Sequence, residues 1–362
     1  LAHATSHLIA GLFRASDRRR FEVTAFSLVR APSDPVQRQM AASVDRWVDI
    51  SGMPEETAAA AVREAGIHIA FDLNVYTHGS PALFARRVAP LQVNYLGYPG
   101  TMGAPHIDYI LADGTVIPAG QDSGYSEKIV RLPHCYLPND NTRMIAAAIP
   151  ARSSQGLPER GIVFCCFNNI YKITPGIFAI WMRILSAVPE SVLWLSSVSA
   201  GARQNLMAAA SADGINPERL IFAKYVVRDE EHLARLSLAD LFLDTLPYNA
   251  HATACDALWA GVPVLTCPGK SFAGRVGASA LLAAGLPELV TNDLAAYEAA
   301  ALRLALNKGA LLTMREKLLR NRSTCPLFDT ARFTHNLESA VMAMWRIYQR
   351  GGTPESFSVT EG

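Results

Sequence analysis

The stretch that decides the fold is 241-LFLDTLPYNAHATACDALWAGVPVLT-266. It begins with a short apolar run at 241–244, passes through a polar loop, and then shows a helical pattern at 252–260 that stops before Gly261. Another apolar run, 263–266, follows at once. Glycine just after the last helical residue is typical of a helix end. A strand, a helix and a strand in this order indicate a parallel sheet.

The same alternation extends outward over the whole chain and predicts an α/β protein. Expected helices lie at 3–16, 55–65, 201–212, 230–237 and 330–350, and expected strands at 21–29, 67–73, 91–96, 162–167, 191–195 and 219–223. We therefore predict two Rossmann-like domains that face each other across a cleft. The predicted parts are domain 1–145, linker 146–160, domain 161–328, a helix 329–350 that packs back on the first domain, and a polar tail 351–362.

Length and composition exclude several classes of protein. The 362 residues carry 33 Lys and Arg against 32 Asp and Glu, a net charge of +1 that argues against a nucleic-acid binder working by bulk electrostatics. No apolar stretch approaches the roughly 18 residues that span a bilayer, so no membrane partner is expected. The six cysteines form no Cys-x-x-Cys pair, which favours a reducing, cytoplasmic compartment. The chain starts at Leu1 without a signal peptide, and we expect a fragment of a longer polypeptide.

The loop and helix start around His251 predict a phosphate site. A helix that follows a parallel strand presents free N–H groups and the positive end of its dipole to that loop. His251 and Thr253 add side-chain donors there, and Asp256, one turn on, could accept from sugar hydroxyls. The alternative is a polar cap followed by an ordinary core helix.

Two further clusters could bind a nucleotide. Lys172 follows the strand 162–167 and stands beside amide side chains, which suits a pyrophosphate, although a surface lysine is usually just solvated. His232 and Arg235 are three residues apart, share a helix face, and could stack on and hydrogen-bond a base. The alternative for 229–235 is an exposed helix start whose acidic residues favour the dipole.

A glycine-rich turn, 96-LGYPGTMGA-104, has neither dinucleotide nor P-loop spacing, and is either a close approach to a ligand or a tight turn. His3 and His7 have zinc-like spacing but no third ligand, so we expect no metal. His68 could face the cleft or be buried in the core.

Read together, five segments resemble the catalytic region of the O-linked N-acetylglucosamine transferase family, including its bacterial members and the related plant SPINDLY proteins. They run in the family's order over nearly the whole chain: LQVNYLGYPGTMGAPHIDYILAD (91–113), YSEKIVRLP (125–133), FNNIYKITP (167–175), EEHLARLSLADLFLDTLPYNAHATACDALWAGVPVLTCPG (230–269) and AGRVGAS (273–279). The resemblance implies a GT-B fold and transfer from UDP-N-acetylglucosamine to Ser or Thr hydroxyls of a protein acceptor, with inversion and without metal or other cofactor. It also implies tetratricopeptide repeats upstream.

The resemblance further implies roles for individual residues. His232 would stack near the uracil, Arg235 would contact its edge, and Val227 would supply backbone hydrogen bonds to the base. Arg228 would belong to the same nucleotide site. The diphosphate would be held by His251, Ala252 and Thr253, and its β-phosphate by Asn169 and Lys172. Asp256 would bind the ribose, and Leu96 and Gly97 would line the sugar pocket. The proton of the acceptor hydroxyl would go to His3, with His68 as the second candidate.

The chain departs from the family at a few positions. Ala252 replaces a common threonine, Asn169 is shorter than the usual glutamine, and Asp229 stands where some members have lysine. The loss of a hydroxyl at Ala252 keeps open a non-catalytic nucleotide-binding scaffold. The plant branch of the superfamily adds a second alternative, a GDP-fucose-dependent O-fucosyltransferase, although His251 favours N-acetylglucosamine.

Overall fold

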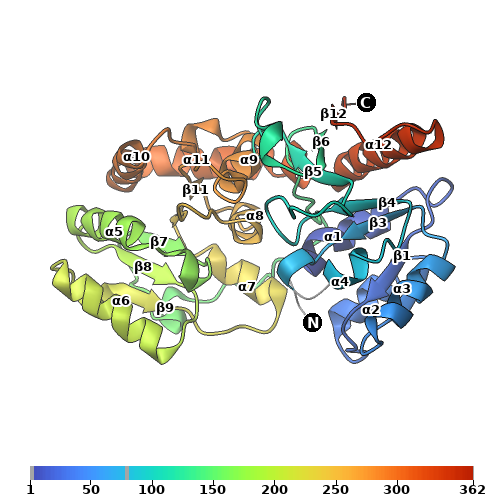
Figure 1. The fold of residues 1–362 in the computed structure, drawn as a ribbon. Coiled ribbons are helices and arrows are strands. Elements are labelled where there is room, and N and C mark those ends of the chain that lie inside the picture. The colour runs from blue at the N-terminus through green and yellow to red at the C-terminus, as the bar shows by residue number, and fades with distance from the viewer. Residues whose placement is uncertain (1–3, 78–80, 362) are drawn as a thin grey trace. The chain divides into compact units, whose positions relative to one another are not determined.

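The computed structural model describes residues 4–77 and 81–361 and divides them into two compact units. Unit 1 is formed by the chain up to Thr142 together with the segment from Pro326 onward, and unit 2 by Arg143–Cys325. In each unit, helices pack on parallel strands (Figure 1). The prediction of an α/β protein with parallel sheets is confirmed.

Unit 1 contains most of the first 142 residues and the end of the chain. Its helices are α1 (Ala4–Ala15), α2 (Pro35–Ala41), α3 (Glu55–Glu64), α4 (Pro81–Phe84) and α12 (Thr330–Gln349), with short 3₁₀ helices η1 (Val75–Thr77), η2 (Asp122–Gly124) and η7 (Pro326–Phe328). Its strands are β1 (Thr24–Ser27), β2 (Arg46–Asp49), β3 (Ile69–Asp72), β4 (Leu91–Asn94), β5 (Tyr109–Asp113), β6 (Lys128–Leu132) and β12 (Phe357–Ser358).

The strands of unit 1 form a five-stranded parallel sheet in the order β12-β6-β5-β4-β3 and a separate parallel pair, β1-β2. Helix α12 packs on α1 and on β6. The polar tail is more structured than the sequence suggests, because Phe357 pairs with Val130, and Ser356 Oγ accepts a hydrogen bond of 2.9 Å from the Ile129 N–H. An added edge strand needs mainly backbone groups, so its sequence carries little signal.

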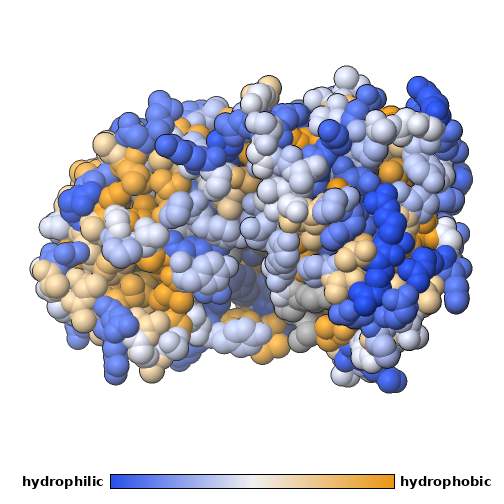
Figure 2. Space-filling view, viewed as in Figure 1, coloured by the Kyte–Doolittle hydropathy of each residue, from blue (hydrophilic) through white to orange (hydrophobic). Residues whose placement is uncertain are grey.

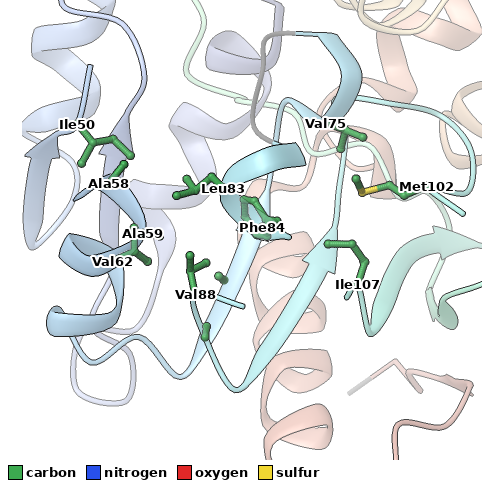
Figure 3. Close-up of a cluster of buried hydrophobic side chains, with 12 residues drawn as sticks. Ile50, Ala58, Ala59, Val62, Val75, Leu83, Phe84, Val88, Met102 and Ile107 are labelled. Carbon is green, nitrogen blue, oxygen red and sulfur yellow. The ribbon is translucent and has the colours of Figure 1, made fainter. Parts of the chain in front are cut away.

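A buried apolar cluster supports the loops at the carboxyl ends of β3 and β4. It extends from Ile50 and α3, across α4, to Val75 and Met102 (Figure 3). Val75 follows β3 and Met102 belongs to the glycine-rich turn that follows β4. The turn at 96–104 is therefore anchored by its own apolar side chain.

Unit 2 carries the stretch that opened the sequence analysis. Its helices are α5 (Pro175–Ala187), α6 (Ala200–Ala212), α7 (Asp229–Leu236), α8 (Ala252–Trp259), α9 (Val276–Ala283), α10 (Leu294–Leu306) and α11 (Lys308–Asn321), with 3₁₀ helices η3 (Arg152–Gln155), η4 (Ile170–Lys172), η5 (Pro217–Arg219) and η6 (Pro287–Leu289). Its strands are β7 (Val163–Cys166), β8 (Val192–Leu195), β9 (Leu220–Phe222), β10 (Leu241–Leu243) and β11 (Val264–Leu265).

The sheet of unit 2 is parallel, with the order β11-β10-β7-β8-β9. The chain winds outward from β7 through β8 to β9, then returns to the other side of β7 and continues through β10 to β11. The winding direction therefore reverses between β7 and β10. Open α/β sheets bind ligands beyond the carboxyl ends of the strands at such a switch point.

The segment 146–160, expected as a linker, lies within unit 2. Ala146 N–H donates to the carbonyl of Glu230 at 3.0 Å, and Arg152 pairs with Asp240 at 3.0 Å. The composition of this segment, rich in Pro, Ser and Gly, does not reveal that it makes these contacts.

On the face drawn in Figure 2, both hydrophilic and hydrophobic residues lie at the surface of each unit. Within the described ranges, no helix combines the length and the apolarity needed to cross a membrane.

Candidate active site

Lys172 lies at the switch point of unit 2, in η4 directly after β7. Its side chain is buried, its Nζ donates to the carbonyl oxygen of Asn249 at 2.9 Å, and the same Nζ lies 3.9 Å from the ring centre of Tyr248. Burial lowers the pKa of Lys172 to about 8, although the charge of Asp244 opposes this effect. The structure thus joins the loop after β7 to the loop after β10 through a lysine amino group.

Asp244 organises the loop after β10. Its Oδ1 accepts from the N–H groups of Thr245 and Ala250, at 2.7 and 2.6 Å, and its Oδ2 accepts from the Thr266 hydroxyl at 2.6 Å. A Cβ on Gly277 would lie 2.4 Å from Oδ2, so only glycine lets α9 approach this closely. Burial raises the pKa of Asp244 to about 6 despite these hydrogen bonds. This carboxyl group, to which the sequence analysis gave no role, shapes the loop and faces the charge of Lys172.

His251 occupies the N-cap position of α8, where its side chain makes no capping hydrogen bond. The ring stacks on Tyr248 with centres 4.9 Å apart, and Nε2 lies 3.2 Å from the carbonyl oxygen of Ala273. Burial, together with the nearby charge of Lys172, lowers the pKa of His251 to about 3. His251 is therefore neutral at pH 7. Because a carbonyl only accepts, Nε2 carries the proton and Nδ1 is the acceptor.

The side-chain donors expected at the start of α8 are both engaged within the protein. His251 donates to Ala273, and the Thr253 hydroxyl donates to Oδ1 of Asn168. The donors that α8 offers to an anion are instead the backbone N–H groups of Ala252 and Thr253 at its start, because the Ala254 N–H already donates to the His251 carbonyl at 3.0 Å. Because these donors are backbone groups, the presence of Ala252 in place of a threonine does not remove any of them.

Asn168, rather than the predicted Asn169, connects the two loops. Asn168 is buried, and its Nδ2 donates to the Thr245 hydroxyl at 2.7 Å. Asn169 is exposed at the start of η4, where its side chain makes no capping bond and its backbone carbonyl accepts from the Lys172 N–H at 3.0 Å. The family resemblance pointed to Asn169 and gave Asn168 no role, because the direction in which consecutive loop residues point depends on the turn.

His232 and Arg235 line an open cavity of about 240 Å³ in unit 2. Arg235 Nη2 donates to Nδ1 of His232 at 3.0 Å, and both side chains lie over the Phe167 ring, at 5.4 Å for the guanidinium and 5.7 Å for the imidazole. Burial lowers the pKa of both His232 and Arg235. The other residues that line the cavity are Ser196, Ser197, Lys224, Tyr225 and Val226.

This cavity suits a flat heteroaromatic base. Phe167 and the neutral ring of His232 offer stacking surfaces, and Arg235 Nε is buried with no hydrogen-bond partner within the described part of the chain. An unpartnered buried donor is rare in proteins, so a bound acceptor at this position would satisfy it.

Val227 and Arg228 lie on the surface beside the cavity. The Val227 side chain is 82% exposed, which leaves only its backbone for a specific contact. Arg228 forms ion pairs with Glu230 and Glu231, the latter at 3.6 Å. The first turn of α7 is acidic, as the simpler interpretation of 229–235 requires.

Arg143, which the sequence analysis did not single out, holds two acidic residues of unit 2. Its Nη1 donates to Asp256 Oδ1 at 2.6 Å, and its Nε and Nη2 donate to the two carboxylate oxygens of Asp229 at 3.0 and 2.9 Å. The Trp259 indole N–H donates to the Arg143 carbonyl at 3.2 Å. Asp256, the residue predicted to bind the ribose, is therefore hydrogen-bonded to an arginine.

In unit 1, the predicted sugar contacts lie in a constrained turn at the carboxyl end of β4. Leu96 has φ +66°, a conformation that non-glycine residues rarely adopt. A Cβ on Gly97 would lie 2.4 Å from the Leu73 carbonyl oxygen and 2.7 Å from the Asn74 Cα, so the backbone there admits only glycine.

The structure describes one of the two predicted proton acceptors. His3 is outside the described residues. His68 precedes β3 and is exposed, with its ring 4.6 Å from that of Trp345. It lies about four residues, or roughly 13 Å, before the carboxyl end of β3, and its predicted role stays a prediction. The sequence pattern placed His68 inside a strand but did not fix where that strand begins.

Among residues 4–77 and 81–361, no group of three or more His, Cys, Asp or Glu residues is arranged to hold a metal ion. All six cysteines are buried.

Two parallel α/β units, one of them doubly wound with its candidate site at the switch point, have the GT-B architecture of glycosyltransferases. Residues 1–149 and 146–337 match glycosyl transferase family 41, and the chain belongs to that family. The family resemblance seen in the sequence is confirmed.

Three similar proteins show how far the likeness extends. A probable UDP-N-acetylglucosamine–peptide N-acetylglucosaminyltransferase of Arabidopsis thaliana is 39% identical over 99% of this chain and 37% of its own length. The UDP-N-acetylglucosamine–peptide N-acetylglucosaminyltransferase of Caenorhabditis elegans is 28% identical over 96% of this chain and 40% of its own. The solved structure of an O-GlcNAc transferase variant from Thermobaculum terrenum has a TM-score of 0.88 at 34% identity, over 97% of this chain and 66% of that one. The chain therefore spans about two fifths of the length of the first two relatives.

Proposed function

We propose that the chain is the catalytic part of a transferase that moves N-acetylglucosamine from UDP-N-acetylglucosamine to Ser or Thr hydroxyls of proteins. The observation that carries this proposal is the buried Lys172 amino group at the switch point, beside a helix, α8, whose amino end has no side-chain cap. The names of the Arabidopsis and Caenorhabditis relatives support the donor and the peptide acceptor.

In the proposed reaction, the acceptor oxygen attacks the anomeric carbon while the bond from that carbon to the β-phosphate oxygen breaks. UDP leaves with the electron pair, and the configuration at the anomeric carbon is inverted. Negative charge that develops on the β-phosphate would be stabilised by Lys172 and by the N–H groups of α8, both fixed before the reaction. The hydroxyl proton needs an acceptor, and His3 remains the proposed base.

The nucleoside would occupy the neighbouring parts of unit 2. The base would stack in the cavity beside Phe167 and His232 and accept from Arg235 Nε, while Asp256 would accept from ribose hydroxyls. We propose that no metal is required, because the protein's own positive groups would stabilise the leaving diphosphate.

Calorimetric titration of the chain with UDP and with GDP, each in the presence of EDTA, tests this proposal. We expect selective UDP binding that disappears in Lys172→Ala. A preference for GDP would favour the fucosyltransferase alternative, and binding of neither nucleotide would favour the non-catalytic scaffold. Transfer of sugar to a Ser-containing peptide in EDTA then tests the reaction itself.

A further inference from the structure

The contact between Arg143 and Asp256 gives one carboxylate of the site a fixed direction. Asp256 Oδ1 is bonded to Arg143 Nη1 at 2.6 Å, which leaves Oδ2 for other donors. The Asp256 side chain is 18% exposed and that of Arg143 is 10% exposed, so this pair is shielded from water more than a surface ion pair is. Charge-assisted bonds of this kind hold their partners more firmly than neutral ones.

The arginine is itself held in place from two sides. Asp229 binds its Nε and Nη2 in a bidentate pair, and Trp259, in the same helix as Asp256, donates to its backbone carbonyl. Arg143 therefore connects the start of α7 with α8, across separations of 86 and 113 residues in the chain.

Arg143 also balances the charge of Asp229. Without it, Asp229 and Asp256 would be two neighbouring carboxylates with no cation between them. The guanidinium of Arg143 lies between them and bonds to both. Like charges repel each other, and the guanidinium bonded to both carboxylates offsets that repulsion.

We propose that Arg143 is a positioning residue for the ribose: it holds Asp256 directed so that its free oxygen accepts from the ribose hydroxyls of the donor nucleotide. This proposal rests on the proposed UDP-sugar function. Arg143 acts through Asp256 and need not touch the sugar or the reacting atoms.

The test compares the affinities of UDP and 2′,3′-dideoxy-UDP, because their ratio isolates the contribution of the ribose hydroxyls. In Arg143→Met, we expect UDP to bind about tenfold more weakly, with a much smaller change for dideoxy-UDP, so that the ratio falls toward that of Asp256→Ala. The double variant Arg143→Met/Asp229→Lys, which returns a cation to α7, should recover part of the ratio.

Arg152→Met is the matched control. Arg152 lies nine residues after Arg143 and pairs with Asp240, an acidic residue outside the site. Its loss should therefore leave the ratio of the UDP and dideoxy-UDP affinities unchanged. An equal loss of UDP and dideoxy-UDP affinity in Arg143→Met would overturn the positioning role. If that variant does not fold, Arg143→Lys serves instead, with an intermediate ratio expected and an unchanged ratio contradicting the proposal. Absence of UDP binding in the unaltered chain would instead refute the proposed function on which this one rests.

Discussion

The amino group of Lys172 lies 3.9 Å from the ring centre of Tyr248, so that the aromatic face and the Asn249 carbonyl fix its direction. Lysine is normally flexible and hydrated. Here burial removes much of that freedom, and the charge is placed at the switch point before any ligand arrives.

Replacing Lys172 with methionine should abolish most transfer while the protein remains folded. Methionine retains the apolar stem but lacks the charge, and loss of one preorganised stabilising group typically costs about 100-fold or more in kcat. The measurement is the rate of sugar transfer to a peptide, with circular dichroism as the check on folding. Lys317→Met is a suitable control, because Lys317 pairs with Glu288 outside the candidate site. Equal activity in the two variants would refute the role of Lys172.

UDP affinity should fall as the pH rises through about 8, the pKa to which burial lowers Lys172. Above this pH the amino group is neutral in the native protein and attracts the diphosphate less. Calorimetric titrations from about pH 7 to about pH 9.5 would show the fall, and Lys172→Met should lack it.

Loss of this proton should lower the affinity for UDP but raise the free energy of unfolding. Below about pH 8 the lysine is protonated in both the native and the unfolded state. Between about 8 and the unfolded value of about 10.4 only the unfolded state binds the proton, so this group makes the free energy of unfolding rise with pH. Urea unfolding of the unaltered chain and of Lys172→Met across this range would separate this contribution, and an identical slope in both proteins would contradict it.

Gly277→Ala should destabilise unit 2 by about 1–3 kcal/mol, because the new Cβ would clash with the Asp244 carboxylate. Gly201→Ala is the matched control: this glycine is also at the start of a helix, and a Cβ there meets nothing within 4 Å. We expect the control to be neutral or slightly stabilising. Urea unfolding gives the free energy of unfolding of both variants, and similar values would refute the predicted clash at position 277.

Thr253→Val should cost about 1–3 kcal/mol of stability. The substitution removes the hydroxyl that donates to the buried Asn168, and an acceptor left without its donor loses its hydrogen bond without regaining water. Thr313→Val provides a comparison, since Thr313 is on an exposed helix surface and donates only to the Gly309 carbonyl. A smaller loss in Thr253→Val than in Thr313→Val would contradict this account.

Much of the fold could be predicted from the sequence, because local patterns report local structure. The helix expected at 252–260 is α8, and Thr174 caps α5 at the residue where the loop after β7 ends. Strands β5 and β6 were not predicted. The buried residues of these two strands are defined by packing between distant segments, and short apolar runs alone did not distinguish them.

The candidate site was predictable in its residue types but not in its connections. The sequence placed His232 and Arg235 on one helix face, and the structure shows them bonded to each other at one wall of a cavity. It could not show that Thr253 donates to Asn168, or that Arg143 reaches Asp256. Such bonds join residues many positions apart, and no local pattern encodes them.

The short strand β12 has a practical consequence for anyone who shortens this protein. Because Phe357 and Ser358 cover the outer edge of β6, a truncation after α12 would leave the backbone groups of Lys128–Leu132 open on that side. An uncovered edge is a template for pairing with other chains and promotes aggregation. The strand in this polar tail thus shields an edge that would otherwise be open to another chain.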